Sequence, residues 1–284
     1  MRGTQFHNPF LLLIKGTFMP LSVEIILLFS CLSVPSLATA RPTNEASALL
    51  KWKASLDEPS QSLLSSWAGT NPCHDNWMGI GCSNGTAAVE SVVISITIQL
   101  SNITGTLDDL DTWSLRNLES FDLSFNSLYG HIPSNIGNMS QLKYLDMSSN
   151  SFSGLIPPEI GMLRSLEELS LNNNSLTGHI PNSIGNITNL TKVLLSGNRL
   201  TGVIPNSIGN LTKLVQVELD ENELTGPIPT LSSLKIENLD LSSNSLSGVI
   251  PSSIGNLTNL YFLYCMIINS LGASHLNLLG LGIS

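Results

Sequence analysis

Charged and aromatic residues are scarce in this chain of 284 residues, at 12% and 6% of the total. Only 12 Lys and Arg stand against 21 Asp and Glu, which leaves a net charge of −9, and no run of basic residues occurs. Because nucleic-acid phosphates repel an acidic surface, we exclude nucleic acid as a partner. The 42% share of hydrophobic residues is too high for a disordered chain, so a folded protein is predicted.

The sequence also lacks a recognisable set of catalytic or metal-binding residues. An enzyme needs nucleophiles, acids or metal ligands at spacings that bring them together, and no such set is found. The glycines of "GIGCSNG" (residues 79–85) do not have the spacing of a dinucleotide-binding loop. We therefore expect a non-enzymatic protein with no catalytic residues, no cofactor and no metal ion.

Cysteine is rare as well, with four residues, one of which lies in an apolar N-terminal segment. That segment ends in Ala-Thr-Ala, which predicts a secretory signal peptide over residues 1–40, cleaved before Arg41. A membrane helix is the alternative, but a Glu, a Pro and several Ser interrupt a run that is too short. Secretion favours a disulfide bond between Cys73 and Cys82 and leaves Cys265 unpaired.

What the chain does contain is a repeat of about 24 residues. An Asn recurs at steps of 24, 24, 24, 24 and 22 residues, and a Pro follows each one at a similar offset. The Asn positions are Asn126, Asn150, Asn174, Asn198, Asn222 and Asn244, and the Pro positions are Pro133, Pro157, Pro181, Pro205, Pro229 and Pro251. Chance does not produce six such copies, so the pattern predicts a solenoid of stacked coils.

Each coil reads like "LTKLVQVELDENELTGPIP", in which alternating apolar residues predict a short strand with one buried face. The residues expected to point inward are Leu214, Val217, Leu219 and Leu224. Each coil then adds one strand to a parallel sheet, and neighbouring coils bury the apolar face that no coil buries alone. Asn222 is expected at the turn after the strand, where its buried amide bonds backbone groups and stacks into a ladder.

The repeat "LxxLxxLxLxxNxLxGxIPxxIGN", over about residues 115–260, resembles the plant-type leucine-rich repeat. The preceding "NEASALLKWKASL", "LLSSW" and "NPCHDNWMGIGC" resemble the N-terminal cap of plant leucine-rich-repeat receptor-like kinases. The sequences of these segments are most similar to those of the male-discoverer-interacting receptor-like kinases, whose ectodomains perceive peptides. The resemblance implies an α/β leucine-rich-repeat solenoid, right-handed, with short parallel strands on its concave face and a helical N-terminal cap.

The cap is expected to begin with an amphipathic helix, for which Asn44 is a suitable N-cap. The expected divisions are a signal peptide at 1–40, the cap at 41–88, a degenerate first coil at 89–114, six repeats at 115–256, and an incomplete seventh repeat with an aberrant apolar tail at 257–284.

The resemblance does not extend to a kinase domain, because no Gly-rich nucleotide loop and no catalytic His-Arg-Asp are present. Two histidines, His131 and His179, occupy the free position of "GHIP" two coils apart. At about 10 Å of sheet spacing they are too far apart to share a metal, so both are expected to be solvated surface residues.

Eight Asn-x-Ser/Thr sequons are present, and several arise from the repeat consensus itself. The sequon residues are Asn84, Asn102, Asn138, Asn173, Asn186, Asn189, Asn210 and Asn256. Secretion predicts partial N-glycosylation, on the flank of the solenoid away from the strands.

A ligand is expected on the concave side, where the outward residues of the strands lie. Asp122 and Asp240 occupy the Asp position of "LDLS", the common family sequence of this segment, so they do not indicate a ligand site. The third to fifth coils depart from that sequence, and Tyr144 adds an aromatic ring. The predicted ligand-binding residues are Tyr144, Glu168, Ser170, Asn172, Lys192, Leu194, Gln216, Glu218 and Asp220. Seven strands would offer roughly 29 Å, enough for about nine residues of an extended peptide. The prevailing acidic residues favour a polar or basic ligand.

We therefore expect an extracellular domain of a plant receptor-like protein or kinase in cell-surface signalling, which binds a peptide or protein ligand. A co-receptor of the same repeat family is a further expected partner, and the location is the outer side of the plasma membrane or the extracellular space. The alternatives are a secreted enzyme inhibitor of the polygalacturonase-inhibitor type and a gene fragment without a function of its own.

The end of the chain decides between these alternatives only in part. Leu257, Leu260 and Leu263 begin a seventh coil in register, but Asn269 comes one position late and the period is lost. Polar interruptions and the lack of a basic flank argue against a membrane anchor after Tyr264. Two interpretations of the tail remain. Its apolar residues cover the open end of the solenoid, or the tail is sequence read past an exon end. Membrane association is expected only through a missing or degenerate C-terminal segment.

Overall fold

The computed structural model describes residues 43–86, 90–231 and 235–265, together with the backbone of 267–269 and 272–274. The predicted signal peptide and most of the predicted tail lie outside the described residues. The chain divides into a unit of residues Met1–Thr39 and a unit of Ala40–Ser284, and every described residue belongs to the second.

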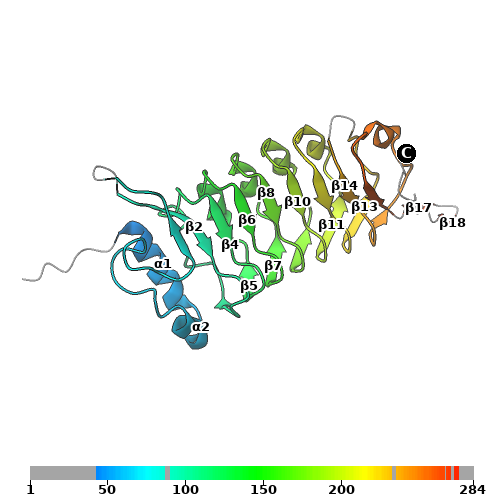
Figure 1. Ribbon diagram of the computed structural model, residues 1–284. Coiled ribbons are helices and arrows are strands. Elements are labelled where there is room, and N and C mark those ends of the chain that lie inside the picture. The colour runs from blue at the N-terminus through cyan, green and yellow to red at the C-terminus, as the bar shows by residue number, and fades with distance from the viewer. Residues whose placement is uncertain (1–42, 87–89, 232–234, 266, 270–271, 275–284) are drawn as a thin grey trace, which may run out of the picture. The chain divides into compact units, whose positions relative to one another are not determined.

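A nine-stranded sheet follows the stack of coils in chain order (Figure 1). Its strands are β1 (Ile80–Cys82), β2 (Val93–Thr97), β4 (Ser120–Asp122), β6 (Tyr144–Asp146), β8 (Glu168–Ser170), β10 (Lys192–Leu194), β12 (Gln216–Glu218), β14 (Asn238–Asp240) and β16 (Phe262–Tyr264). Every neighbouring pair from β2 to β16 is parallel, which confirms the predicted solenoid.

The sheet is longer than the seven strands expected from the sequence. At one end β1 adds an antiparallel strand beside β2, and at the other β16 pairs in parallel with β14. Nine strands at about 4.8 Å span roughly 38 Å. The seventh coil thus begins as predicted, and beyond it β17 (Ile267–Asn269) and β18 (Gly272–Ser274) form an antiparallel pair that does not continue the repeat.

A second sheet, which the sequence did not lead us to expect, forms from the "NxLxG" segments that follow the first sheet. Its seven strands are β3 (Thr104–Gly105), β5 (Ser127–His131), β7 (Ser151–Leu155), β9 (Ser175–Gly178), β11 (Arg199–Val203), β13 (Glu223–Gly226) and β15 (Ser245–Leu246). The glycine of most segments lies close to the preceding coil, and Gly105 of β3 lies close to Leu56 of the cap. At Gly202 the backbone has φ +76°, and a Cβ would collide with the His179 ring, so only glycine fits.

Within the described residues, short 3-10 helices follow five of the six repeat prolines and complete those coils. They are η1 (Ser134–Asn138), η2 (Pro158–Met162), η3 (Asn182–Asn186), η4 (Asn206–Asn210) and η5 (Ser252–Asn256). The proline that precedes each helix has the extended backbone of an N-cap residue, with φ near the value that its ring imposes, as at Pro181 (φ −67°). The coils therefore run from strand to strand to 3-10 helix.

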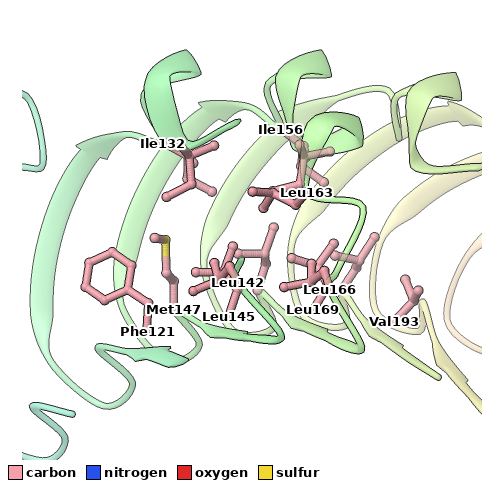
Figure 2. Close-up of a cluster of buried hydrophobic side chains, with 14 of the residues drawn as sticks. Phe121, Ile132, Leu142, Leu145, Met147, Ile156, Leu163, Leu166, Leu169 and Val193 are labelled. Carbon is pink, nitrogen blue, oxygen red and sulfur yellow. The ribbon is translucent and has the colours of Figure 1, made fainter. Parts of the chain in front are cut away.

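The core is a continuous column of apolar side chains between the two sheets and the 3-10 helices (Figure 2). In the coil used above, all four predicted inward residues, Leu214, Val217, Leu219 and Leu224, are at most 2% exposed. In Figure 2, Leu145, Leu169 and Val193 lie in successive coils, as the repeat predicts. Each coil therefore depends on its neighbours for burial.

The predicted asparagine ladder is present. The Asn222 amide nitrogen donates to the Leu195, Leu219 and Asp220 carbonyl oxygens at 3.0–3.1 Å. The Asn222 side-chain oxygen accepts the Leu200 N–H at 2.9 Å. Each amide joins its own turn to the preceding coil, so the side chain pairs backbone groups that lie away from water.

The N-terminal cap consists of α1 (Asn44–Ser55), α2 (Glu58–Leu63) and a loop closed by a disulfide bond. The predicted bond between Cys73 and Cys82 is present, with the two Cα atoms 5.7 Å apart, and Cys265 is free. The expected N-cap is wrong by one residue, because the Thr43 hydroxyl, and not Asn44, accepts the Ala46 N–H at 3.0 Å. Thr43 precedes the first helical turn and has the extended backbone that a capping side chain needs.

Val217 borders an apolar cavity of about 10 Å³ in the coil whose repeat is two residues shorter. We expect Val217→Leu to raise the free energy of unfolding by up to about 0.8 kcal/mol, because the added methylene fills the cavity. Urea denaturation of the two proteins measures the difference. Val193 occupies the same column but does not border the cavity, so Val193→Leu is the control and should destabilise the fold. Equal effects of both substitutions would contradict this account.

Candidate functional site: the outward face of the nine-stranded sheet

We use the name strand face for the outward side chains of β4 to β16 and of the residue two places after each strand. The parallel register aligns them in rows across the sheet. One row contains Ser120, Tyr144, Glu168, Lys192, Gln216, Asn238 and Phe262, and the next contains Asp122, Asp146, Ser170, Leu194, Glu218, Asp240 and Tyr264. The strands alternate inward and outward residues, so every coil contributes to both rows.

The register brings the predicted ligand-binding residues together. Tyr144, Glu168, Lys192 and Gln216 are successive members of the first row, and Ser170, Leu194 and Glu218 of the second. Asn172 and Asp220 follow β8 and β12 by two residues. Eight of the nine are partly exposed, but Ser170 is only 3% exposed, and its hydroxyl donates to the Asn172 side-chain oxygen at 2.7 Å. Ser170 therefore offers little surface to a ligand.

The charges on the strand face are partly neutralised within it. Lys192 Nζ lies 2.8 Å from Glu168 Oε2, so these two side chains compensate each other. At the next coils, Glu218 accepts from Gln216 at 2.6 Å, Asp220 accepts from Ser196, and Asp240 accepts from Ser242. No Lys or Arg of the described part of the chain pairs with these three carboxylates. The C-terminal half of the strand face is therefore acidic.

Tyr144 is held by the carboxylates around it. Its hydroxyl donates to Asp146 Oδ2 at 3.1 Å. Burial raises the pKa of Tyr144 well above its ordinary value, and the neighbouring charges of Asp146, Asp122 and Glu168 raise it further. The phenol is therefore neutral at physiological pH and available as an aromatic surface with a fixed hydrogen bond.

The sequence analysis missed an aromatic pair at the C-terminal end of the strand face. Phe262 and Tyr264 are both about half exposed, and their rings stack with centroids 6.3 Å apart and planes 7° apart. They continue the two rows beyond Asn238 and Asp240. Counting 24 residues from those two positions leads to Phe262 and Tyr264, but the predicted ligand-binding residues end at Asp220.

The sequons are not confined to the flank away from the strands. Asn138, Asn186, Asn210 and Asn256 end 3-10 helices, as expected for that flank. Asn173 instead follows Asn172 directly at the margin of the strand face, and Asn84 and Asn102 lie in the turns after β1 and β2. These three positions therefore differ from the predicted flank. Asn102 and Asn173 do so because the repeat also generates Asn residues in the turn after a strand, and Asn84 because it belongs to the cap.

Among the described residues, neither a histidine nor a metal site nor a membrane-spanning helix contributes to the strand face. The His131 and His179 Nδ1 atoms lie 3.0 and 3.1 Å from the Ser153 and Thr201 carbonyl oxygens, which accept from them. No group of three or more His, Cys, Asp or Glu among the described residues is arranged to hold a metal ion. Within the same part of the chain, no helix is long and apolar enough to cross a membrane.

Family models match three parts of the chain. A leucine rich repeat N-terminal domain matches residues 42–83, a leucine-rich repeat region matches 95–225, and a single leucine rich repeat matches 235–257. The matches agree with the observed cap and coils.

The relatives are plant receptors that are much longer than this chain. MDIS1-interacting receptor like kinase 2 of Arabidopsis thaliana is 41% identical over 127 residues, which are 44% of this chain and 12% of that protein. Among solved structures, the PEPR1–AtPEP1 crystal structure has a TM-score of 0.71 at 33% identity over 80% of this chain and 32% of that one.

A second structural relative is the Arabidopsis receptor kinase HAESA in complex with the peptide hormone IDA and the co-receptor SERK1. It has a TM-score of 0.52 at 32% identity, over 80% of this chain and 46% of that one. Since the three matching models are all leucine-rich-repeat models and together match most of the chain, this chain belongs to the leucine-rich-repeat proteins, and it is similar to parts of plant receptors.

Proposed function

We propose that this chain is an extracellular ligand-binding region of a plant receptor-like protein or kinase, and that it binds an extended, polar or basic peptide along the strand face. The location is the cell surface or the extracellular space. A co-receptor of the same repeat family is a second partner, by analogy with the HAESA complex, whose description names a peptide hormone and a co-receptor. The chain itself performs no catalysis in this proposal.

The observation that supports this function best is the arrangement of the C-terminal half of the strand face. Glu218, Asp220 and Asp240 have no basic partner in the described chain. Asp240 lies directly beside Tyr264 in the register, and Glu218 lies beside Asp240 on the other side. Carboxylates and exposed aromatic rings together favour the guanidinium or ammonium group of a ligand. Tyr144, Leu194 and the neutral Glu168–Lys192 pair then contact the uncharged part of the peptide.

The proposal includes the divisions of the chain and its modification. We propose the cap at 41–88, the degenerate first coil at 89–114 and six repeats at 115–256, preceded by a signal peptide and followed by the start of a seventh repeat. Glycans are proposed at the eight sequons. A glycan at Asn173 would limit the room for a ligand near β8, because this exposed side chain adjoins the strand face.

The test is selection of binding peptides from a random twelve-residue library displayed on phage. We expect the selected peptides to be rich in Arg and Lys, since the charged part of the site is acidic. The double variant Glu218→Gln/Asp220→Asn should bind them about tenfold more weakly, which is about 1.4 kcal/mol. Calorimetry at low and high salt measures both affinities, and salt should weaken wild-type binding.

The matched control is Glu159→Gln/Glu223→Gln, which removes the same charge from η2 and from the second sheet. Its affinity for the selected peptides should equal that of the wild type. Equal losses in both double variants would reveal a general charge effect, and no loss in either would refute the strand face as the binding site.

A further inference from the structure

A cleft of about 250 Å³ lies at the N-terminal end of the solenoid, away from the strand face. It opens where the start of α1, the segment leading into β2 and the segment before β4 meet. We name it the cap cleft, and its chemistry comes from Glu45, Glu90, Trp113, Arg116 and Asn117. No predicted ligand-binding residue lines it, so the proposed function of the strand face does not depend on it.

Trp113 is unlike the other tryptophans of the protein. Trp52, Trp67 and Trp77 are at most 2% exposed, and each indole N–H donates to a backbone carbonyl oxygen at 2.8 Å. Trp113 is 62% exposed, and in the described chain its indole N–H has no hydrogen-bond acceptor. A large aromatic surface and a free donor at the wall of a cleft are features of a binding site.

The Trp113 ring is held in place although it is exposed. The Trp113 backbone N–H donates to Asp111 Oδ1 at 3.1 Å, and Ser114 donates to Asp111 Oδ2 at 2.7 Å, so the turn is fixed. The Arg116 guanidinium carbon lies 5.9 Å from the ring centroid, a cation–π distance. Arg116 makes no ion pair within the described residues, so its donors remain available.

Two carboxylates supply acceptors in the same cleft. Glu45 Oε1 accepts the Val93 N–H at 3.2 Å, and Glu90 Oε1 accepts from Asn71 Nδ2 at 3.4 Å. Burial raises the pKa of Glu45, and the charge of Glu90 adds to this, while the bond from Val93 opposes it. Each carboxylate has one oxygen outside these bonds, and Asn117 adds an exposed amide.

The combination of charges selects against charged ligands. A cation would face Arg116, and an anion would face Glu45 and Glu90, all lining the same small cleft. A neutral ring with many hydroxyl groups fits both, because each hydroxyl donates to a carboxylate or accepts from the guanidinium. Such a ring also has an apolar C–H face that stacks on an indole. We propose that the cap cleft binds one neutral saccharide ring, stacked on Trp113.

Two sources of that saccharide fit the geometry. Ser83 and Val92 pair across the base of the β1–β2 hairpin, where the Ser83 N–H donates to the Val92 oxygen at 2.9 Å. Asn84, the next residue, is exposed and begins a sequon, so a glycan attached there starts beside Ser91 and Val92 at the cleft wall. The other source is a free neutral oligosaccharide from outside the protein.

The experiment titrates the secreted full chain with chitotriose, a neutral N-acetylglucosamine trimer, and follows tryptophan fluorescence. It uses wild type and Asn84→Gln, because an attached glycan would occupy the cleft of the wild type. Binding to Asn84→Gln alone assigns the cleft to the protein's own glycan, and binding to both proteins assigns it to a free saccharide. In the first case Trp113 of the wild type is also shielded from acrylamide quenching.

Trp113→Ala is introduced into the protein that binds and is titrated by calorimetry, because it lacks the reporting indole. It should weaken binding by about tenfold or more, since stacking on the indole is lost. Tyr129→Ala is the control, because Tyr129 is a half-exposed aromatic residue of the second sheet and should not matter. The charged trimers of galacturonic acid and of glucosamine should bind less tightly than chitotriose. The proposal is overturned if neither protein binds chitotriose, if Trp113→Ala binds as the parent does, or if the charged trimers bind equally well.

Discussion

Replacing Asn198 with alanine is expected to lower the free energy of unfolding by about 3 kcal/mol. The side chain is 8% exposed, and its amide nitrogen donates to the Leu171 and Leu195 carbonyl oxygens at 3.0 and 3.1 Å. Its oxygen accepts the buried Leu176 N–H at 3.0 Å. The carbonyls each keep a second asparagine, Asn174 and Asn222, but the Leu176 N–H loses this acceptor and a cavity remains.

The measurement for Asn198→Ala is equilibrium unfolding in urea, followed by circular dichroism. Asn206→Ala is the matched control, because Asn206 is exposed on η4 and its side chain makes no hydrogen bond within the described chain. That variant should differ from the wild type by less than about 0.5 kcal/mol. A loss below about 1 kcal/mol for Asn198→Ala would show that water replaces the amide at little cost.

Replacing Gly161 with alanine is expected to destabilise the protein by about 2–3 kcal/mol, the upper part of the range for overpacking. A Cβ at this position in η2 would collide with the Ser183 carbonyl oxygen and lie 2.6 Å from Ser183 Cβ in the next coil. Part of the obstacle is backbone, so no side-chain rotation relieves it. The coils would have to separate, which weakens the packing on both sides of η2.

Gly255 supplies the control for Gly161, because it is the fourth residue of η5 ("SSIGN") as Gly161 is the fourth residue of η2 ("PEIGM"). A Cβ there would meet no described atom within 4 Å. We expect Gly255→Ala to be neutral or to stabilise by up to about 1 kcal/mol, since alanine restricts the unfolded chain. Thermal unfolding of the two variants tests the pair. Similar behaviour of both would mean that the coils adjust freely at η2.

Much of the architecture was predictable because the repeat makes each position serve the same purpose in every coil. The alternation around Val217 and Leu219 predicted which side chains are buried, and the Asn period predicted the ladder. The second sheet was missed because its segments, such as Glu223–Gly226, contain a glycine and polar residues that read as a turn. Their backbone pairs only because the next coil places an equivalent segment beside them.

The strand face was predictable to a similar extent. Counting by 24 aligns Glu168 with Lys192, but the length and direction of the side chains decide that they form an ion pair. The same count placed Ser170 in the site, although its short side chain lies below the surface made by its neighbours. A row is thus a property of the sequence, and the surface that it presents depends on side-chain packing.

The sequence by itself determined the coil, its inward residues and its asparagine ladder, because these follow from local spacing that recurs along the chain. It also indicated the disulfide of the cap, through the small number of cysteines and the predicted secretion. Only the tertiary structure decided which copies of a motif are constrained. Gly161 and Gly255 both follow an Ile at the same position of a 3-10 helix, yet one is packed against the next coil and the other is open. Trp113 and Trp77 likewise differ only in what lies around them. The contacts of a residue depend on atoms from distant parts of the chain, and the local sequence around that residue does not contain them.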